Sequence, residues 1–141
     1  MTTTRERLIT GLLVLVGLIN LAPAVGVLSA KLLADAYGIP APEGDLLILL
    51  RHRAILLGII GGLTLAAARW RHLRPAAMAC AGLSMGSFLL LALPPPGHGD
   101  ALRGIVIADV IGLLFLAGAA LAQREETKAP PEAPAAAAAR R

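Results

Sequence analysis

Four long, predominantly apolar runs constrain the fold of this chain more than any other feature. They occupy residues 8–30, 46–68, 75–93 and 104–122. A helix needs about 20 residues to cross the hydrocarbon core of a bilayer, and each run has this length or nearly so. Backbone groups in lipid must form hydrogen bonds within their own segment, so α-helices are the expected form. We therefore predict an all-α fold, an integral membrane four-helix bundle within residues 1–122.

The composition supports a membrane protein and argues against a nucleic-acid partner. Hydrophobic residues make up 57% of the chain, compared with roughly 45–50% in ordinary soluble domains. The formal net charge is +4, but only 3% of the residues are aromatic, too few for a surface on which bases stack. The expected partner of the positive charge is membrane lipid. Cys80 is the single cysteine, which excludes an internal disulfide.

The positions of the basic residues predict the orientation in the membrane. Arg and Lys concentrate before the first run, between the second and third, and after the fourth, as Arg5, Arg7, Arg69, Arg71, Arg74, Arg124, Lys128, Arg140 and Arg141. With four spans, all three groups fall on one side, and the positive-inside rule makes that side the cytoplasm. We expect a multi-pass protein of a bacterial inner membrane with cytoplasmic N- and C-termini. A cleaved signal peptide is the alternative for the first run, but this run exceeds the roughly 7–15 residues of a signal core.

The C-terminal segment, residues 123–141, has a different composition from the rest of the chain. It contains Pro130, Pro131 and Pro134, followed by five alanines and two arginines. Such low-complexity sequence offers nothing from which to build a core. We predict a disordered, Ala/Pro-rich cytoplasmic tail.

Polar side chains within the four runs are the candidates for function, because burying them in a membrane is costly. They are Asn20 in the first run, Arg51, His52 and Arg53 in the second, Ser84 and Ser87 in the third, and Asp109 in the fourth. At about 1.5 Å per residue, Arg51, Ser87 and Asp109 each lie about 9 Å from the outer end of their helix, and Asn20 about 15 Å. The sequence therefore predicts one polar layer in the outer half of the bundle.

Helical phase suggests how this layer is arranged. At about 100° per residue, Arg51 shares a face with Gly58 and Gly62, a small-xxx-small pair that favours close helix contact. That face is expected to point inward, so we predict an Arg51–Asp109 ion pair with Asn20, His52, Ser84 and Ser87 nearby. Arg53 is expected to be an interfacial residue that extends outward to the lipid head groups.

Three interpretations of the layer stay open. The ion pair could serve only to fix packing and register, the layer could line a pocket for a small molecule, or the arginines could be interfacial anchors without a partner. No catalytic residue is predicted, because the sequence has no catalytic motif, and no metal site, because His52, His72 and His98 fall in different segments.

Four stretches resemble a known group of proteins. They are 17–30 (GLINLAPAVGVLSA), 50–58 (LRHRAILLG), 84–89 (SMGSFL) and 108–112 (ADVIG). They are similar to small bacterial four-span membrane proteins with a DoxX-like layout. The resemblance covers nearly everything from residue 8 to residue 121 and implies a four-helix membrane fold. Some of those proteins carry the label phosphopantetheine adenylyltransferase, but this chain has neither the α/β pattern nor the phosphate-binding histidine motif of that enzyme.

Three functions are compatible with these features. The first is a non-enzymatic bundle that binds a small amphiphile or a partner subunit through the polar layer. The second is a subunit of a membrane redox complex, because the DoxX-like group includes subunits associated with quinone chemistry; a quinone is then the candidate cofactor, and none is predicted otherwise. The third is a minimal transporter, for which four spans would require a homo-oligomer.

Overall fold

The computed structural model of the chain describes residues 4–92 and 99–128 and is all-α. Within these two ranges no strand is present, which confirms the predicted fold class. The helical elements are α1 (Thr4–Leu21), the 3₁₀ segment η1 (Ala22–Leu28), α2 (Ala30–Tyr37), α3 (Gly44–Arg69), the 3₁₀ turn η2 (Arg71–Leu73), α4 (Arg74–Ala92) and α5 (Asp100–Lys128).

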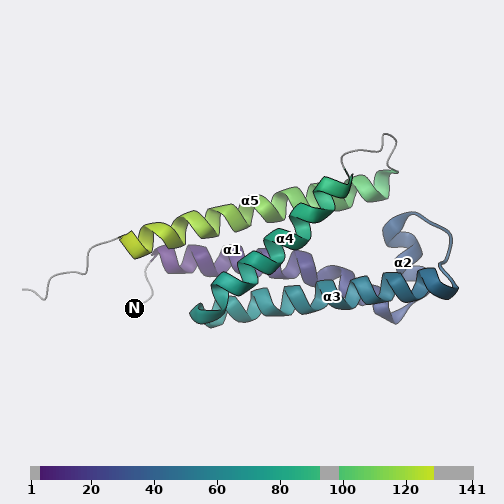
Figure 1. Ribbon diagram of the computed structural model, residues 1–141, viewed down its shortest axis with the longest axis horizontal. Coiled ribbons are helices and arrows are strands. Elements are labelled where there is room, and N and C mark those ends of the chain that lie inside the picture. The colour runs from purple at the N-terminus through teal and green to yellow at the C-terminus, as the bar shows by residue number, and fades with distance from the viewer. Residues whose placement is uncertain (1–3, 93–98, 129–141) are drawn as a thin grey trace, which may run out of the picture.

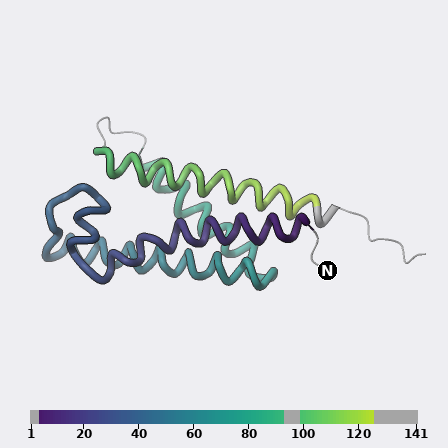
Figure 2. The backbone as a smooth tube through the Cα atoms, turned by 180° about the vertical axis from the view of Figure 1, so that it is seen from behind, coloured from purple at the N-terminus to yellow at the C-terminus, as the bar shows by residue number. Residues whose placement is uncertain are grey.

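The four long helices form an elongated bundle with α1 between α3 and α5 (Figures 1 and 2). One face of α1 carries Ile9, Leu13 and Val16, all fully buried. Their spacing of three and four residues is the helical repeat that places side chains on one stripe. Figure 1 shows α4 crossing the bundle obliquely, from the end of α3 toward the start of α5. The core is therefore built around α1.

Four helical segments of the described chain are long and apolar enough to cross a membrane: Thr4–Leu28, Gly44–Arg69, Arg71–Ala92 and Asp100–Glu125. Most of their residues are not buried by the rest of the protein. An outer surface of exposed leucines and isoleucines is unfavourable in water and stable in lipid. By length and composition, the chain is a multi-pass membrane protein.

The end of the bundle near α2 contains a 3₁₀ segment and a short helix that were not predicted from the sequence. Pro23 lacks a backbone N–H and lies at the start of η1, where the α-helix changes to a 3₁₀ helix. The Ser29 hydroxyl then caps α2 by accepting a hydrogen bond from the Lys31 N–H, at 3.1 Å. Gly38, in the left-handed conformation with φ of 63°, ends α2. The connection between the first two apolar runs therefore contains the short helix α2.

The C-terminal helix also extends further than predicted. Residues 123–128, assigned to the tail from the sequence, continue α5 to Lys128. Gln123, Arg124 and Glu125 are good helix formers, and Arg5 pairs with Glu125 at 3.1 Å, which joins this last part of α5 to α1. The remainder of the predicted tail, residues 129–141, lies outside the described residues.

Close packing of α1 on α3 depends on Gly61. A Cβ atom at Gly61 would lie 2.6 Å from the Leu21 nitrogen and 2.7 Å from the Gly17 carbonyl oxygen. Both are backbone atoms, so no side-chain rearrangement could relieve the contact. By contrast, a Cβ at Gly62 would meet nothing within 4 Å. Gly61 therefore marks the face of α3 that contacts α1, and Gly62 lies on the open surface.

At the opposite end of the bundle from α2, a charged cluster joins α1, α3, η2 and α4. Arg74, at the start of α4, donates from Nη2 to Glu6 Oε1 at 2.5 Å and from Nη1 to Glu6 Oε2 at 3.1 Å. Its Nε donates to the Ala67 carbonyl at 3.3 Å, and Arg71 donates to Glu6 Oε2 at 2.7 Å. The Arg74 side chain is 1% exposed. We call this part of the molecule the Arg74 end; its ion pairs were not predicted from the sequence.

Candidate ligand-binding cavity

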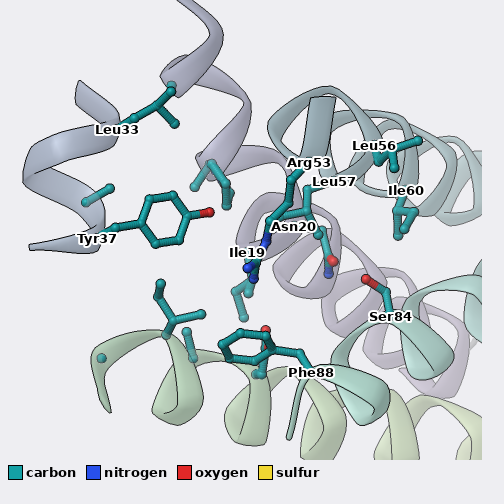
Figure 3. A pocket seen from close by; sticks show the side chains of 18 of the residues that line it. Ile19, Asn20, Leu33, Tyr37, Arg53, Leu56, Leu57, Ile60, Ser84 and Phe88 are labelled. Atoms are coloured by element: carbon teal, nitrogen blue, oxygen red, sulfur yellow. The ribbon is translucent and has the colours of Figure 1, made fainter. Parts of the chain in front are cut away.

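A cavity of about 700 Å³ lies within the bundle at the end that includes α2. All five α-helices and η1 contribute to its wall (Figure 3). The volume falls within the roughly 300–1,000 Å³ typical of sites for small molecules and cofactors. We call this part of the molecule the cavity end.

The wall is mostly apolar, with a few polar side chains. The polar or titratable lining residues are Asn20, Tyr37, Arg53, Ser84, Ser87 and Asp109. They come from α1, α2, α3, α4 and α5, so no single helix supplies the polar groups. An apolar pocket with a few converging polar groups is the usual composition of a specific ligand site.

The rim of the cavity is apolar and exposed. Leu91 of α4 and Leu56 of α3 line the cavity and are 76% and 46% exposed, and Val25 of η1 is also an exposed lining residue. A rim of this kind is favourable where acyl chains surround the protein. The cavity therefore opens onto the apolar outer surface of the bundle rather than being enclosed.

Arg53 is the cation of the cavity. Its guanidinium carbon lies 4.7 Å from the centre of the Phe88 ring and 5.6 Å from the centre of the Tyr37 ring. Both distances are within the range of cation–π attraction. Figure 3 shows the Arg53 side chain extending from α3 toward these two rings. In the described parts of the chain, its N–H groups have no hydrogen-bond or ion-pair partner.

Asp109 is the anion of the cavity. It is half-buried in the first half of α5 and lines the same cavity as Arg53. The ion pairs found among residues 4–92 and 99–128 do not include one between these two side chains. The cavity thus contains two opposite charges that attract one another without direct contact.

Asn20 and the two serines differ in how many of their side-chain polar atoms already have a hydrogen-bond partner. The Asn20 side-chain nitrogen donates to the Val16 carbonyl at 3.0 Å and approaches the Met85 sulfur at 3.8 Å. The Ser87 hydroxyl donates to the Ser84 carbonyl at 3.0 Å, a local bond of the kind expected for serine in a helix. The Asn20 amide oxygen and the Ser84 hydroxyl have no partner within the described ranges, so both remain able to bind a ligand.

The arrangement on α3 differs from the one predicted from the sequence. The structure places Arg53, not Arg51, in the cavity with Asp109, and no ion pair between Arg51 and Asp109 occurs among the described residues. Arg53, expected to extend to the lipid head groups, points inward instead. Arg51 is half-buried with its Nε atom unpartnered, and His52 is exposed; neither lines the cavity.

Arg53 takes the place predicted for Arg51 because α3 is rotated about its axis relative to the predicted orientation. The prediction took Gly58 and Gly62 as the contact face. Gly58 does lie close to η1, where its Cβ would be 3.0 Å from the Ala24 Cβ, but the closest approach to α1 is at Gly61, and Gly62 has open space around it. Ile55, on the face assigned to Arg51, is 46% exposed. The buried positions Ala54, Gly61 and Thr64 instead turn the neighbouring Arg53, Leu57 and Ile60 toward the cavity.

The other predicted residues do meet in space. Asn20, Ser84, Ser87 and Asp109 all line the same cavity. Tyr37 and Phe88 were not predicted, although the chain has one tyrosine and two phenylalanines. Because the chain has so few aromatic residues, Tyr37 and Phe88 could have been identified from the sequence as candidate site residues.

Metal binding finds no support in the described part of the chain, where no three His, Cys, Asp or Glu side chains gather to hold an ion. His98 lies outside the described residues. No protein-family model, curated protein or solved structure matches the chain.

Proposed function

We propose that this protein binds a membrane amphiphile in the cavity. The observation that carries the proposal is a ligand-sized, mostly apolar cavity that contains Arg53 and Asp109 without an ion pair between them. An apolar wall suits a chain, and the charged pair suits a polar head group. The exposed rim residues Leu56 and Leu91 give such a molecule a route from the surrounding lipid.

The proposal includes an orientation in a bacterial inner membrane. Arg71 and Arg74 lie at the Arg74 end, and Arg69 ends α3 there, so the positive-inside rule assigns that end to the cytoplasm. The cavity would then lie in the outer half of the membrane. Arg53 and Asp109 are each nine residues into their helices, a depth of about 14 Å from the outer helix ends.

The test fills the cavity with a bulky side chain and asks whether a ligand is lost. Ala108 lines the cavity, whereas its neighbour Ile107 does not and is 54% exposed. We expect Ala108→Trp to remove any amphiphile that co-purifies in mild detergent, measured by native mass spectrometry, because the indole would occupy the binding volume. Ile107→Trp is the matched control and should retain the ligand.

Two results would contradict the proposal. The first is a ligand retained equally by both variants, which would place it on the outer surface. The second is the absence of saturable binding when palmitate or a lysophospholipid is added to the wild-type protein. A co-purifying quinone that is lost from Ala108→Trp alone would favour a subunit of a redox complex, the second of the functions compatible with the sequence.

A further inference from the structure

The charges in the cavity restrict the chemical nature of the ligand more than the shape of the cavity does. Arg53 and Asp109 supply one positive and one negative charge, and Tyr37 is the remaining titratable group in the wall. A purely anionic ligand would pair with Arg53 and be repelled by Asp109. A purely cationic ligand would have the opposite problem. In either case one charge would remain in the cavity without a partner, which is strongly unfavourable in a poorly hydrated site.

We propose that the cavity recognises a zwitterionic head group, in which an ammonium lies beside a phosphate or carboxylate oxyanion. This inference depends on the proposed function, since it specifies the amphiphile that the cavity binds. The oxyanion accepts hydrogen bonds from the Arg53 guanidinium, and the ammonium donates to the Asp109 carboxylate. Both charges of the protein are then neutralised by one ligand that has no net charge.

The surroundings of Arg53 favour an oxyanion as its partner. The rings of Tyr37 and Phe88 attract the guanidinium from their faces, at 5.6 and 4.7 Å from the ring centres. Such contacts position a guanidinium without using its N–H groups as donors. The donors have no hydrogen-bond partner in the described chain, and a guanidinium can bind a phosphate or carboxylate through two parallel hydrogen bonds.

The contacts of Arg53 with the two aromatic rings also indicate which kind of ligand ammonium group the cavity prefers. Aromatic faces are the usual binding surface for a trimethylammonium group, but in this cavity Arg53 already lies over both rings. A ligand ammonium must therefore be recognised by hydrogen bonds to Asp109 and to the free amide oxygen of Asn20. A primary ammonium has the N–H groups for these bonds, and a trimethylammonium has none.

The experiment compares probes that share a chain and differ in the head group. The full-length wild-type protein in nanodiscs is titrated with lysophosphatidylethanolamine, lysophosphatidylcholine, palmitate and hexadecylamine, and binding is measured by native mass spectrometry. We expect lysophosphatidylethanolamine to bind about tenfold more tightly than each of the others, the difference associated with one charge-assisted hydrogen bond. Phosphoethanolamine, which has the head group without a chain, should bind more weakly than the lysolipid.

Variants assign each half of the head group to its partner. Arg53→Gln and Asp109→Asn should each lower the affinity for lysophosphatidylethanolamine by about tenfold or more. Asp109→Asn should also remove the preference over lysophosphatidylcholine. Arg51→Gln is the matched control, since Arg51 is on the same helix and does not line the cavity, and should leave the affinity unchanged.

The outcomes separate this inference from the proposed function. Equal binding of palmitate and lysophosphatidylethanolamine would overturn the zwitterionic head group, while loss of both in Ala108→Trp would still support an amphiphile site. Phosphoethanolamine binding as tightly as the lysolipid would support the head-group assignment and overturn the amphiphile. Binding of every probe unaffected by Ala108→Trp would overturn both. The wild-type probe series decides the question even if a variant fails to fold.

Discussion

Arg74 and Arg53 are the same residue type at opposite ends of one bundle, and their surroundings differ in kind. Arg74 is 1% exposed and donates to both carboxylate oxygens of Glu6 and to the Ala67 carbonyl. Arg53 is half-buried, contacts two aromatic rings and has no hydrogen-bond acceptor in the described chain. The chain satisfies one arginine itself and leaves the donors of the other directed at a cavity.

The two ends of the bundle also differ in how closely their apolar side chains are packed. The main cluster of buried side chains includes Ile9, Leu13, Ala77 and Ala119, which lie toward the Arg74 end, and reaches Val16 and Met85. Beyond Val16 and Met85 the wall of the cavity begins, at Ile19 and Asn20 on α1. A well-packed half holds the helices together, so the other half can keep an opening without the bundle separating. We infer that the Arg74 end provides stability and the cavity end provides binding.

The largest effect should come from removing the charge at the Arg74 end. Arg74→Gln removes the two hydrogen bonds to Glu6 and the one to the Ala67 carbonyl, while the Arg71–Glu6 pair remains. We expect a loss of about 2–4 kcal/mol in the free energy of unfolding, as for the loss of buried hydrogen bonds between charged groups. Equilibrium unfolding in mixed micelles measures it. Glu125→Gln removes the partner of the exposed Arg5–Glu125 pair, 67% exposed at Glu125, and should change stability by at most about 1 kcal/mol.

A double-mutant cycle sharpens this test. If Arg74 and Glu6 act as a pair, Glu6→Gln should add little to the loss already caused by Arg74→Gln. Fully additive losses would show that each side chain stabilises the bundle through other contacts, and the distinction between the two ends would then not depend on this ion pair.

An intermediate effect is expected at the contact between α1 and α3. A Cβ atom at Gly61 would overlap the backbone of α1 near Leu21, so Gly61→Ala must push the helices apart. Overpacking of this kind costs typically about 1–3 kcal/mol, again measured by unfolding in mixed micelles. Gly62→Ala introduces the same methyl group on the same helix into open space and should not destabilise the protein. Equal effects of the two substitutions would show that the contact at Gly61 does not limit helix approach.

The sequence predicted the helices well because the requirement for a membrane span is almost purely compositional. An apolar run of sufficient length needs no information about its neighbours, and the four runs correspond to the four candidate spans. The short helix α2 could not be predicted in this way. It is eight residues long, too short to show a clear periodicity, and it depends on the Ser29 and Gly38 caps.

The site was harder to predict because it depends on rotation about a helix axis. A polar side chain within a membrane span is costly in free energy, and this identified Asn20, Ser84, Ser87 and Asp109. The criterion does not require knowing how each helix is rotated about its axis. Choosing between Arg51 and Arg53 required knowing which glycine of α3 contacts α1. Gly58, Gly61 and Gly62 are all plausible contact positions in the sequence, and only the packing against Gly17 and Leu21 distinguishes Gly61. The Glu6–Arg74 pair likewise joins residues far apart in the chain.

The smallest effect on stability should come from the change that most affects binding. Arg53→Gln is the same substitution as Arg74→Gln, but it breaks no hydrogen bond or ion pair of the described chain. Each lost cation–π contact is worth about 0.5–2 kcal/mol, and Asp109 loses the attraction of Arg53, but a guanidinium no longer has to be kept in the cavity without a hydrogen-bonded partner. We expect these opposing changes to leave a net loss of about 1 kcal/mol for the ligand-free protein, smaller than that of Arg74→Gln and measured under the same conditions. If Arg53→Gln instead destabilised the bundle as much as Arg74→Gln, then the Arg53 side chain would be holding α2 and α4 in place, and its free donors would no longer be evidence for a ligand.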